Sequence, residues 1–235
     1  MRMIPNILTL LNLFSGCIGL VYVFTEQFYG AILCVGFSLL FDFMDGLMAR
    51  LLKQQHPYGG DLDSLADVVS FGVLPGAMYY SVISGLPLVE PIPWMVFVGF
   101  IFTLFGAYRL ARFNVMHGSE AHFSGLPIPS AAIFVTGLYW IDHSPGCESC
   151  ASAFINPYVI FGSIFFLSYL MVSSLPHFSF KVKGMGWRGQ EIQWIYVILV
   201  LCLILLVKEV AVSLSIVLYV FMSLIYFSFT SKQSS

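Results

Sequence analysis

Five aspartates gather in one short stretch of an otherwise apolar chain. They make up five of the twelve acidic residues of the sequence, and they are Asp42, Asp45, Asp61, Asp63 and Asp67. A carboxylate costs about 2.5–3.5 kcal/mol at the centre of a membrane helix, so such a group needs a compensating partner. A hard divalent cation offsets the mutual repulsion of several carboxylates. The stretch therefore predicts a divalent metal site close to one membrane surface.

The spacing sorts four of these carboxylates into two pairs. Asp42 and Asp45 are three residues apart, and Asp63 and Asp67 are four apart, so each pair shares one face of a helix. A polar break, KQQHPYGG, separates the pairs. We expect two antiparallel helices joined by this break, with the two pairs pointing at each other. Gly46 has no side chain and would let a ligand approach the helix backbone closely.

The same stretch follows the pattern D-x2-D-G-x2-A-R-x8-G-x3-D-x3-D. Its fixed positions are Asp42, Asp45, Gly46, Ala49, Arg50, Gly59, Asp63 and Asp67. At every one of them it resembles the signature of the CDP-alcohol phosphotransferases, which transfer a phosphatidyl-type group from a CDP-activated lipid to an alcohol and release CMP. The alternative is an ion transporter lined by acidic residues. In a transporter we would expect acidic residues spread across the depth of the membrane, whereas these aspartates cluster near one membrane surface.

The resemblance implies a role for each motif residue. One or two Mg²⁺ or Mn²⁺ ions would be held by all four carboxylates of the motif, Asp42, Asp45, Asp63 and Asp67. Asp67 would also be the general base that accepts the proton of the attacking alcohol. The CDP group would lie against Gly46, Ala49, Arg50 and Gly59.

The beginning of the chain, MRMIPNILTLLNLF, also resembles the family, whose first membrane helix often starts with a Pro-Asn…Leu-Thr stretch beside the nucleotide. Asn6 and Thr9 are thus candidate nucleotide contacts. The alternative is that Thr9 and Asn12 are polar groups that only help helices to pack.

A second informative stretch contains two arginines three residues apart, Arg109 and Arg112. An arginine fork suits a phosphate or a carboxylate, although the same residues could simply anchor a helix at the lipid headgroups. The segments RLARFN, FSGLPIPS and SSLPHFSFK, in this order, resemble the phosphatidylserine synthase branch of the family. That branch uses CDP-diacylglycerol and L-serine, and either arginine could bind the serine carboxylate. Glycerol 3-phosphate or inositol phosphate as acceptor, and an archaeal ether lipid as donor (archaetidylserine synthase), remain alternatives.

The composition is that of a polytopic membrane protein, with 59% hydrophobic residues, 9% charged residues and a mean hydropathy of +0.90. We expect an all-α bundle of about eight transmembrane helices forming one domain, 1–235, with a six-helix catalytic core and two further C-terminal helices. The predicted spans are 7–25, 29–51, 66–85, 93–112, 127–141, 154–175, 192–208 and 210–230. The first span reads as a membrane helix and not as a cleaved signal peptide. No basic run or zinc-finger spacing suggests a nucleic-acid partner.

The distribution of basic residues predicts the orientation. With a cytoplasmic N-terminus, nine of the ten Lys and Arg residues fall on the cytoplasmic side, and Lys208 falls outside. The acidic stretch would then open to the cytoplasm from the cell (inner) membrane, among membrane lipids. Members of the family are often dimeric, so a homodimer is one arrangement that the resemblance implies. Cys147 and Cys150 form a lone CxxC in an outer loop, which we treat as peripheral.

Overall fold

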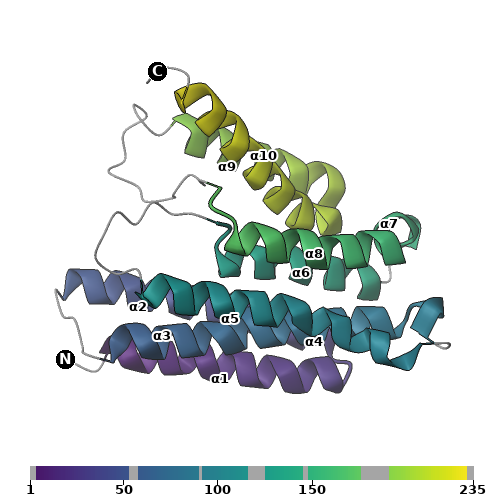
Figure 1. Cartoon of the computed structure of the whole chain (residues 1–235), viewed down its shortest axis with the longest axis horizontal. Coiled ribbons are helices and arrows are strands. Elements are labelled where there is room, and N and C mark those ends of the chain that lie inside the picture. Colours follow the sequence, from purple (N-terminus) through teal and green to yellow (C-terminus); the bar gives the residue numbers. More distant parts are fainter. Residues whose placement is uncertain are drawn as a thin grey trace.

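The computed structural model describes residues 4–52, 58–89, 92–115, 125–144, 148–175 and 191–231. Throughout these ranges the regular elements are helices, and no strand occurs in them. The helices run roughly along one direction, with the C-terminal pair crossing above the others (Figure 1). This arrangement confirms the predicted all-α class.

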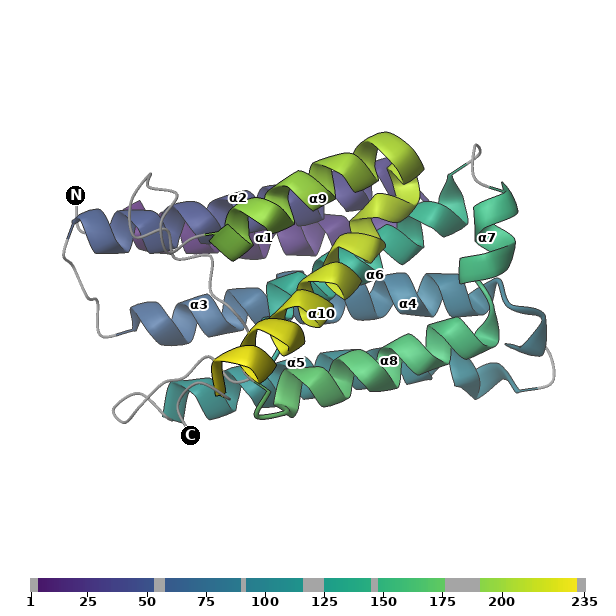
Figure 2. The same ribbon diagram turned by 90° about the horizontal axis from the view of Figure 1, so that it is seen from above.

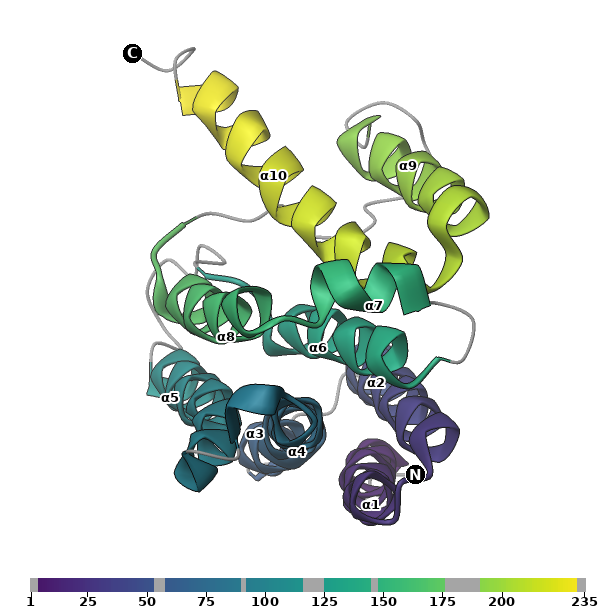
Figure 3. The same cartoon turned by 90° about the vertical axis from the view of Figure 1, so that its right-hand side faces the viewer.

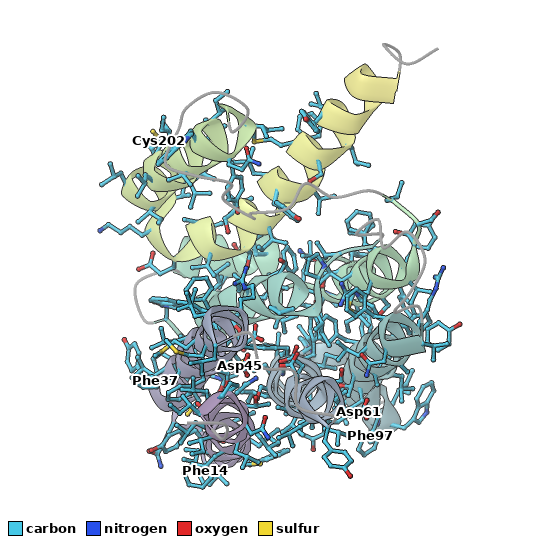
Figure 4. The ribbon with its side chains drawn as sticks, turned by 90° about the vertical axis from the view of Figure 1, so that its left-hand side faces the viewer. Phe14, Phe37, Asp45, Asp61, Phe97 and Cys202 are labelled. Carbon is cyan, nitrogen blue, oxygen red and sulfur yellow. The ribbon has the colours of Figure 1, made fainter. Side chains whose placement is uncertain are left out.

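The first two helices form a hairpin. Helix α1 (Ile4–Phe24) packs along α2 (Phe28–Leu51), and both are long and apolar enough to cross a membrane. Buried hydroxyls tie them together, because Ser15 donates a hydrogen bond of 2.9 Å to the Cys34 carbonyl. Phe14 and Phe37 point outward at the periphery and are more than half exposed, as suits side chains that face lipid (Figure 4).

The third helical stretch is continuous from residue 59 to residue 84. It consists of α3 (Gly59–Asp67), a π-helical segment η1 (Val68–Val73) and α4 (Leu74–Ser84). The predicted span began at residue 66, so the helix starts seven residues earlier than expected. The extra turns are polar, and hydropathy alone could not include them in a membrane span. They are also the turns that carry Asp61 and Asp63.

The next helices complete two rows around a buried centre. A 3₁₀ segment η3 (Pro93–Gly99) leads into α5 (Phe100–Val115), followed by α6 (Ile128–His143) and α8 (Pro157–Val172); η2 (Pro87–Val89) and α7 (Glu148–Phe154) are short connections. Seen end-on, α1, α3–α4 and α5 form one row and α2, α6 and α8 the other (Figure 3). Between the rows, the Tyr79 and Ser163 hydroxyls lie 2.8 Å apart and link α4 to α8.

The C-terminal helices lie on top of this six-helix arrangement. Helix α9 (Glu191–Val207) is followed by the short η4 (Lys208–Val210), where Lys208 has a positive φ of 40°, and then by α10 (Ala211–Ser231). Helix α10 crosses α6 obliquely (Figure 2), and Ser213 donates a hydrogen bond of 2.9 Å to the Phe134 carbonyl there.

Every predicted span coincides with a helix, but not every helix has the length of a span. Among the described residues, five helical stretches are long and apolar enough to cross a membrane, and α9 with α10 counts as one of them. Helices α6 and α8 have 16 residues each, about 24 Å, which is shorter than the hydrocarbon core of about 30 Å. The polytopic membrane bundle is therefore confirmed, and the number of eight spans stays a prediction.

Candidate active site

Three carboxylates from two helices converge at one point. Asp42 of α2 and Asp63 and Asp67 of α3 each offer an oxygen atom, and these atoms lie within 4.8 Å of one another. Asp67 is only 7% exposed. The two helix faces predicted from the spacing thus meet as expected, across the break between α2 and α3.

Asp45, the fourth predicted ligand, has a different neighbour. It is 6% exposed and accepts a hydrogen bond of 2.7 Å from the Thr9 hydroxyl. It lies one turn along α2 from Asp42, within electrostatic range of Asp42 and Asp63, but it is not one of the three converging residues. In the end-on view it sits between the helices, at the inner side of α2 (Figure 4).

Asn12 of α1 is a site residue that the sequence analysis treated only as a packing group. Its amide Nδ2 donates a hydrogen bond of 3.1 Å to Oδ1 of Asp67, and the residue is completely buried. The signal was its position three residues after Thr9, which places both on the face of α1 that meets the carboxylates. What it contacts could not be read from the sequence.

The acidic group fits a divalent cation. Carboxylate oxygens are the ligands that Mg²⁺, Mn²⁺ and Ca²⁺ prefer, and three such atoms are within reach of one ion. The Oδ1 atom of Asp63 is buried without a hydrogen-bond partner among the described residues. Buried carboxylate oxygens normally have partners, so a cation provides what the surrounding protein does not.

The predicted nucleotide residues line the same end of α1, α2 and α3. A Cβ atom built on Gly46 would meet nothing within 4 Å, so there is open space beside this turn of α2. Arg50 is exposed, and its Nε donates a hydrogen bond of 2.9 Å to the Gly46 carbonyl. Ala49 is half-buried, and Gly59 is the first residue of α3. Together with half-buried Asn6, these remain predicted CDP contacts.

The two arginines of α5 have different surroundings. Arg112 is exposed and donates a hydrogen bond of 3.1 Å to the Val172 carbonyl at the end of α8. Arg109 is half-buried within electrostatic range of Asp67, and its Nε has no hydrogen-bond partner in the described part of the chain. Of the two, Arg109 is therefore the one near the acidic cluster, and Arg112 fastens α5 to α8.

A further contact sets the distance between α3 and α5. The Ser64 hydroxyl and the Asn114 side chain exchange hydrogen bonds of 2.9 and 3.1 Å; Ser64 directly follows Asp63 in α3, and Asn114 lies five residues after Arg109 in α5. Cys147 and the side chain of Cys150 lie outside the described residues.

Comparisons with known proteins agree with this geometry. Residues 2–174 match the family model described as CDP-alcohol phosphatidyltransferase. The chain is 32% identical to an archaetidylserine synthase of Methanothermobacter thermautotrophicus, over 78% of this chain and 72% of that protein. It is 34% identical to a CDP-diacylglycerol–serine O-phosphatidyltransferase of Helicobacter pylori, over 75% and 72%, and 31% identical to one of Bacillus subtilis, over 76% and 92%. The match covers the acidic cluster, Asn12 and Arg109, and the chain belongs to the CDP-alcohol phosphatidyltransferase family.

Proposed function

We propose that this protein is a CDP-diacylglycerol–serine O-phosphatidyltransferase. The observation that carries the proposal is the convergence of Asp42, Asp63 and Asp67 within 4.8 Å inside a helical membrane bundle of this family. Relatives from three genera bear this name or that of the archaetidylserine enzyme. The RLARFN stretch, which contains Arg109, supports serine as the acceptor.

The acidic cluster would hold Mg²⁺ or Mn²⁺ against the diphosphate of the donor. Asp42, Asp63 and Asp67 would be its ligands, and Asp45 would complete the acidic set. When bound, the ion supplies positive charge that makes the β-phosphorus electrophilic and stabilises CMP as the leaving group. The open space beside Gly46 leaves room for the nucleotide next to the backbone of α2.

The remaining chemistry belongs to side chains of this chain. Arg109 would bind the serine carboxylate and so direct the serine hydroxyl toward Asp67. Asp67 would accept the hydroxyl proton as the serine oxygen forms its bond to phosphorus and the bond to CMP breaks. Oδ1 of Asp67 accepts a hydrogen bond from the Asn12 amide, and Oδ2 would accept the proton.

The distribution of charge supports a cytoplasmic site. Nine of the ten basic residues fall on the side of the acidic stretch in the predicted topology, which favours the cell (inner) membrane with this end facing the cytoplasm. Soluble serine and a membrane-embedded CDP-lipid could both reach the cluster there. A homodimer is in keeping with the family.

An acceptor panel tests the proposal. Purified protein in detergent is given CDP-diacylglycerol, Mg²⁺ or Mn²⁺, and serine, glycerol 3-phosphate or inositol phosphate, and CMP is measured. We expect CMP release that needs both metal and serine, with phosphatidylserine as the lipid product. Release with glycerol 3-phosphate alone would contradict the serine assignment. A parallel reaction with a CDP-activated archaeal ether lipid tests the donor that the Methanothermobacter relative suggests.

A further inference from the structure

The first helix presents two hydrogen-bond donors to the acidic cluster. Thr9 and Asn12 are three residues apart on α1, and their side chains donate to Asp45 and Asp67 respectively. Both residues are buried, at 4% and 0% exposure. The motif that defines the family begins only at α2, so these donors come from outside it.

The backbone of Asn12 joins α1 to two neighbouring helical segments independently of its side chain. Its carbonyl oxygen accepts hydrogen bonds from Ser38 of α2, at 3.3 Å, and from Ser70 of η1, at 2.9 Å. Here two hydroxyls already fasten this turn of α1 to both neighbours.

The amide of Asn12 is therefore left for Asp67. Its Nδ2 donates to Asp67 Oδ1, and its own Oδ1 has no partner among the described residues. The hydrogen bond to Asp67 and the anchored backbone of Asn12 together keep this buried amide in place. The result is a donor fixed on one oxygen of the proposed base.

The two oxygens of a carboxylate are equivalent, and rotation about the Cβ–Cγ bond of an aspartate exchanges their positions. A donor on Oδ1 restricts this rotation and leaves Oδ2 without a bond to the Asn12 amide. Groups that orient a metal-ligating or catalytic carboxylate in this way typically contribute 10–100-fold in metal affinity or activity.

We propose that Asn12 is a positioning residue that orients Asp67 for proton acceptance and cation binding. The inference rests on the proposed function for its kinetic consequence, whereas its consequence for cation binding does not require turnover. Thr9 is expected to act on Asp45 in the same way from one turn earlier.

The test compares Asn12→Ala and Asn12→Asp with Ser15→Ala. Asn12→Asp keeps the size of the side chain and removes the N–H donor. Ser15 lies one turn further on α1, is buried, and bonds to the α2 backbone without touching a carboxylate, so it controls for α1–α2 packing. For each protein we would measure kcat, the KM for serine and the melting temperature in detergent. Mn²⁺ affinity would be measured by electron paramagnetic resonance without substrate.

We expect both Asn12 variants to lose 10–100-fold in kcat with the serine KM within about threefold of the wild type, because positioning acts on the reacting state. Asn12→Ala should also bind Mn²⁺ about tenfold more weakly, and Ser15→Ala should match the wild type in kcat and in Mn²⁺ affinity. Wild-type kcat in Asn12→Asp, or wild-type Mn²⁺ affinity in Asn12→Ala, would overturn the proposal. Equal losses in Ser15→Ala would do so too, since they would indicate a packing role.

The two proposals fail differently. If the wild type releases CMP only with another acceptor, the serine assignment fails, and the same kcat comparison is made with that acceptor. If Asn12→Ala does not fold, Asn12→Asp supplies the kinetic comparison. If no acceptor supports turnover, the Mn²⁺ titration still decides whether Asn12 supports the carboxylate cluster.

Discussion

Thr9 donates a hydrogen bond of 2.7 Å to Asp45, and this bond joins the first helix to the second inside the bundle. It gives Asp45 a protein partner, whereas Asp42, Asp63 and Asp67 converge on one another. The four carboxylates of the motif are thus not equivalent. Asp45 and Asp67 each accept a hydrogen bond from α1, whereas only Asp42, Asp63 and Asp67 converge on one point.

Loss of the Thr9 hydroxyl should expose this difference. Thr9→Val keeps the shape of the side chain but removes the only side-chain donor to buried Asp45 among the described residues, which costs about 1–3 kcal/mol. We expect a lower melting temperature in detergent. Thr25→Val is the matched control, because Thr25 is exposed, donates to the Val21 carbonyl of its own turn and accepts only a long bond of 3.4 Å from Gln27, without touching a carboxylate. An unchanged melting temperature in Thr9→Val would show that Asp45 does not depend on this bond.

Replacing the proposed base should stop the chemistry and spare donor binding. Asp67→Asn removes proton acceptance with little change in size, so kcat should fall by about 10²–10⁴-fold. Binding of CDP-diacylglycerol, measured by equilibrium dialysis of a labelled donor in detergent, should stay within a few-fold of the wild type. Turnover near the wild-type rate would exclude Asp67 as the base.

Removing one converging carboxylate should weaken cation binding. Oδ1 of Asp63 is buried without a hydrogen bond in the described structure, and Asp63→Asn replaces the carboxylate with a neutral amide. Mn²⁺ affinity should therefore drop about tenfold or more. Asp61→Asn is the control, since Asp61 is exposed on the same helix and outside the cluster. Chelation of the wild type with EDTA should stop CMP release, and added Mg²⁺ or Mn²⁺ should restore it. Equal Mn²⁺ affinities in the two variants would argue against the site.

The two arginines of α5 should separate in their effect on serine. Arg109→Gln should raise the serine KM about 10- to 100-fold, because a hydrogen bond to a charged group contributes about 1.5–3 kcal/mol. Arg112→Gln should change the KM little and instead lower the melting temperature, since Arg112 bonds to the end of α8. Steady-state kinetics over a serine series measures both. The reverse pattern would transfer the acceptor role to Arg112.

Gly16 should tolerate no side chain. A Cβ atom there would lie 2.5 Å from Ser70 Oγ and 2.9 Å from Ser70 Cα, where α1 meets η1. Gly16→Ala should therefore destabilise the protein by about 1–3 kcal/mol through overpacking. Gly36→Ala on α2 is the control: its Cβ would meet nothing within 4 Å, and alanine favours a helix by up to about 1 kcal/mol. A thermal melt that moves equally in both variants would contradict the close α1–η1 contact.

The sequence predicted two pairs of aspartates that face each other, and three of these four carboxylates converge; this much could be predicted because helix periodicity is a local property. The three- and four-residue spacings fixed which carboxylates share a face, and the polar break fixed that α2 and α3 turn back on each other. The beginning of α3 was missed for a related reason. Its first turns are too polar to resemble a membrane span, although they lie on the site side of a long buried helix.

The residues that were missed or left open depend on contacts between distant segments. Asn12 and Asp67 are 55 residues apart, and nothing in either local pattern predicts their hydrogen bond. Arg109 and Arg112 looked alike in sequence, and they differ because Val172, 60 residues beyond Arg112, supplies it with a carbonyl. Such assignments need the packed structure.

The π-helical segment η1 begins at the residue after Asp67. A π turn contains one residue more than an α turn. The side chains before it therefore point in a different direction around the helix axis than they would in a continuous α-helix. The direction of the carboxylate face of α3 is therefore independent of the direction of the buried sides of α4. Thr103 of α5 stabilises this segment, because its hydroxyl donates a hydrogen bond of 2.8 Å to the Gly72 carbonyl. Losing one residue here would turn Asp63 and Asp67 by about 100° about the helix axis. The number of residues in this segment therefore determines the direction in which the two aspartates point.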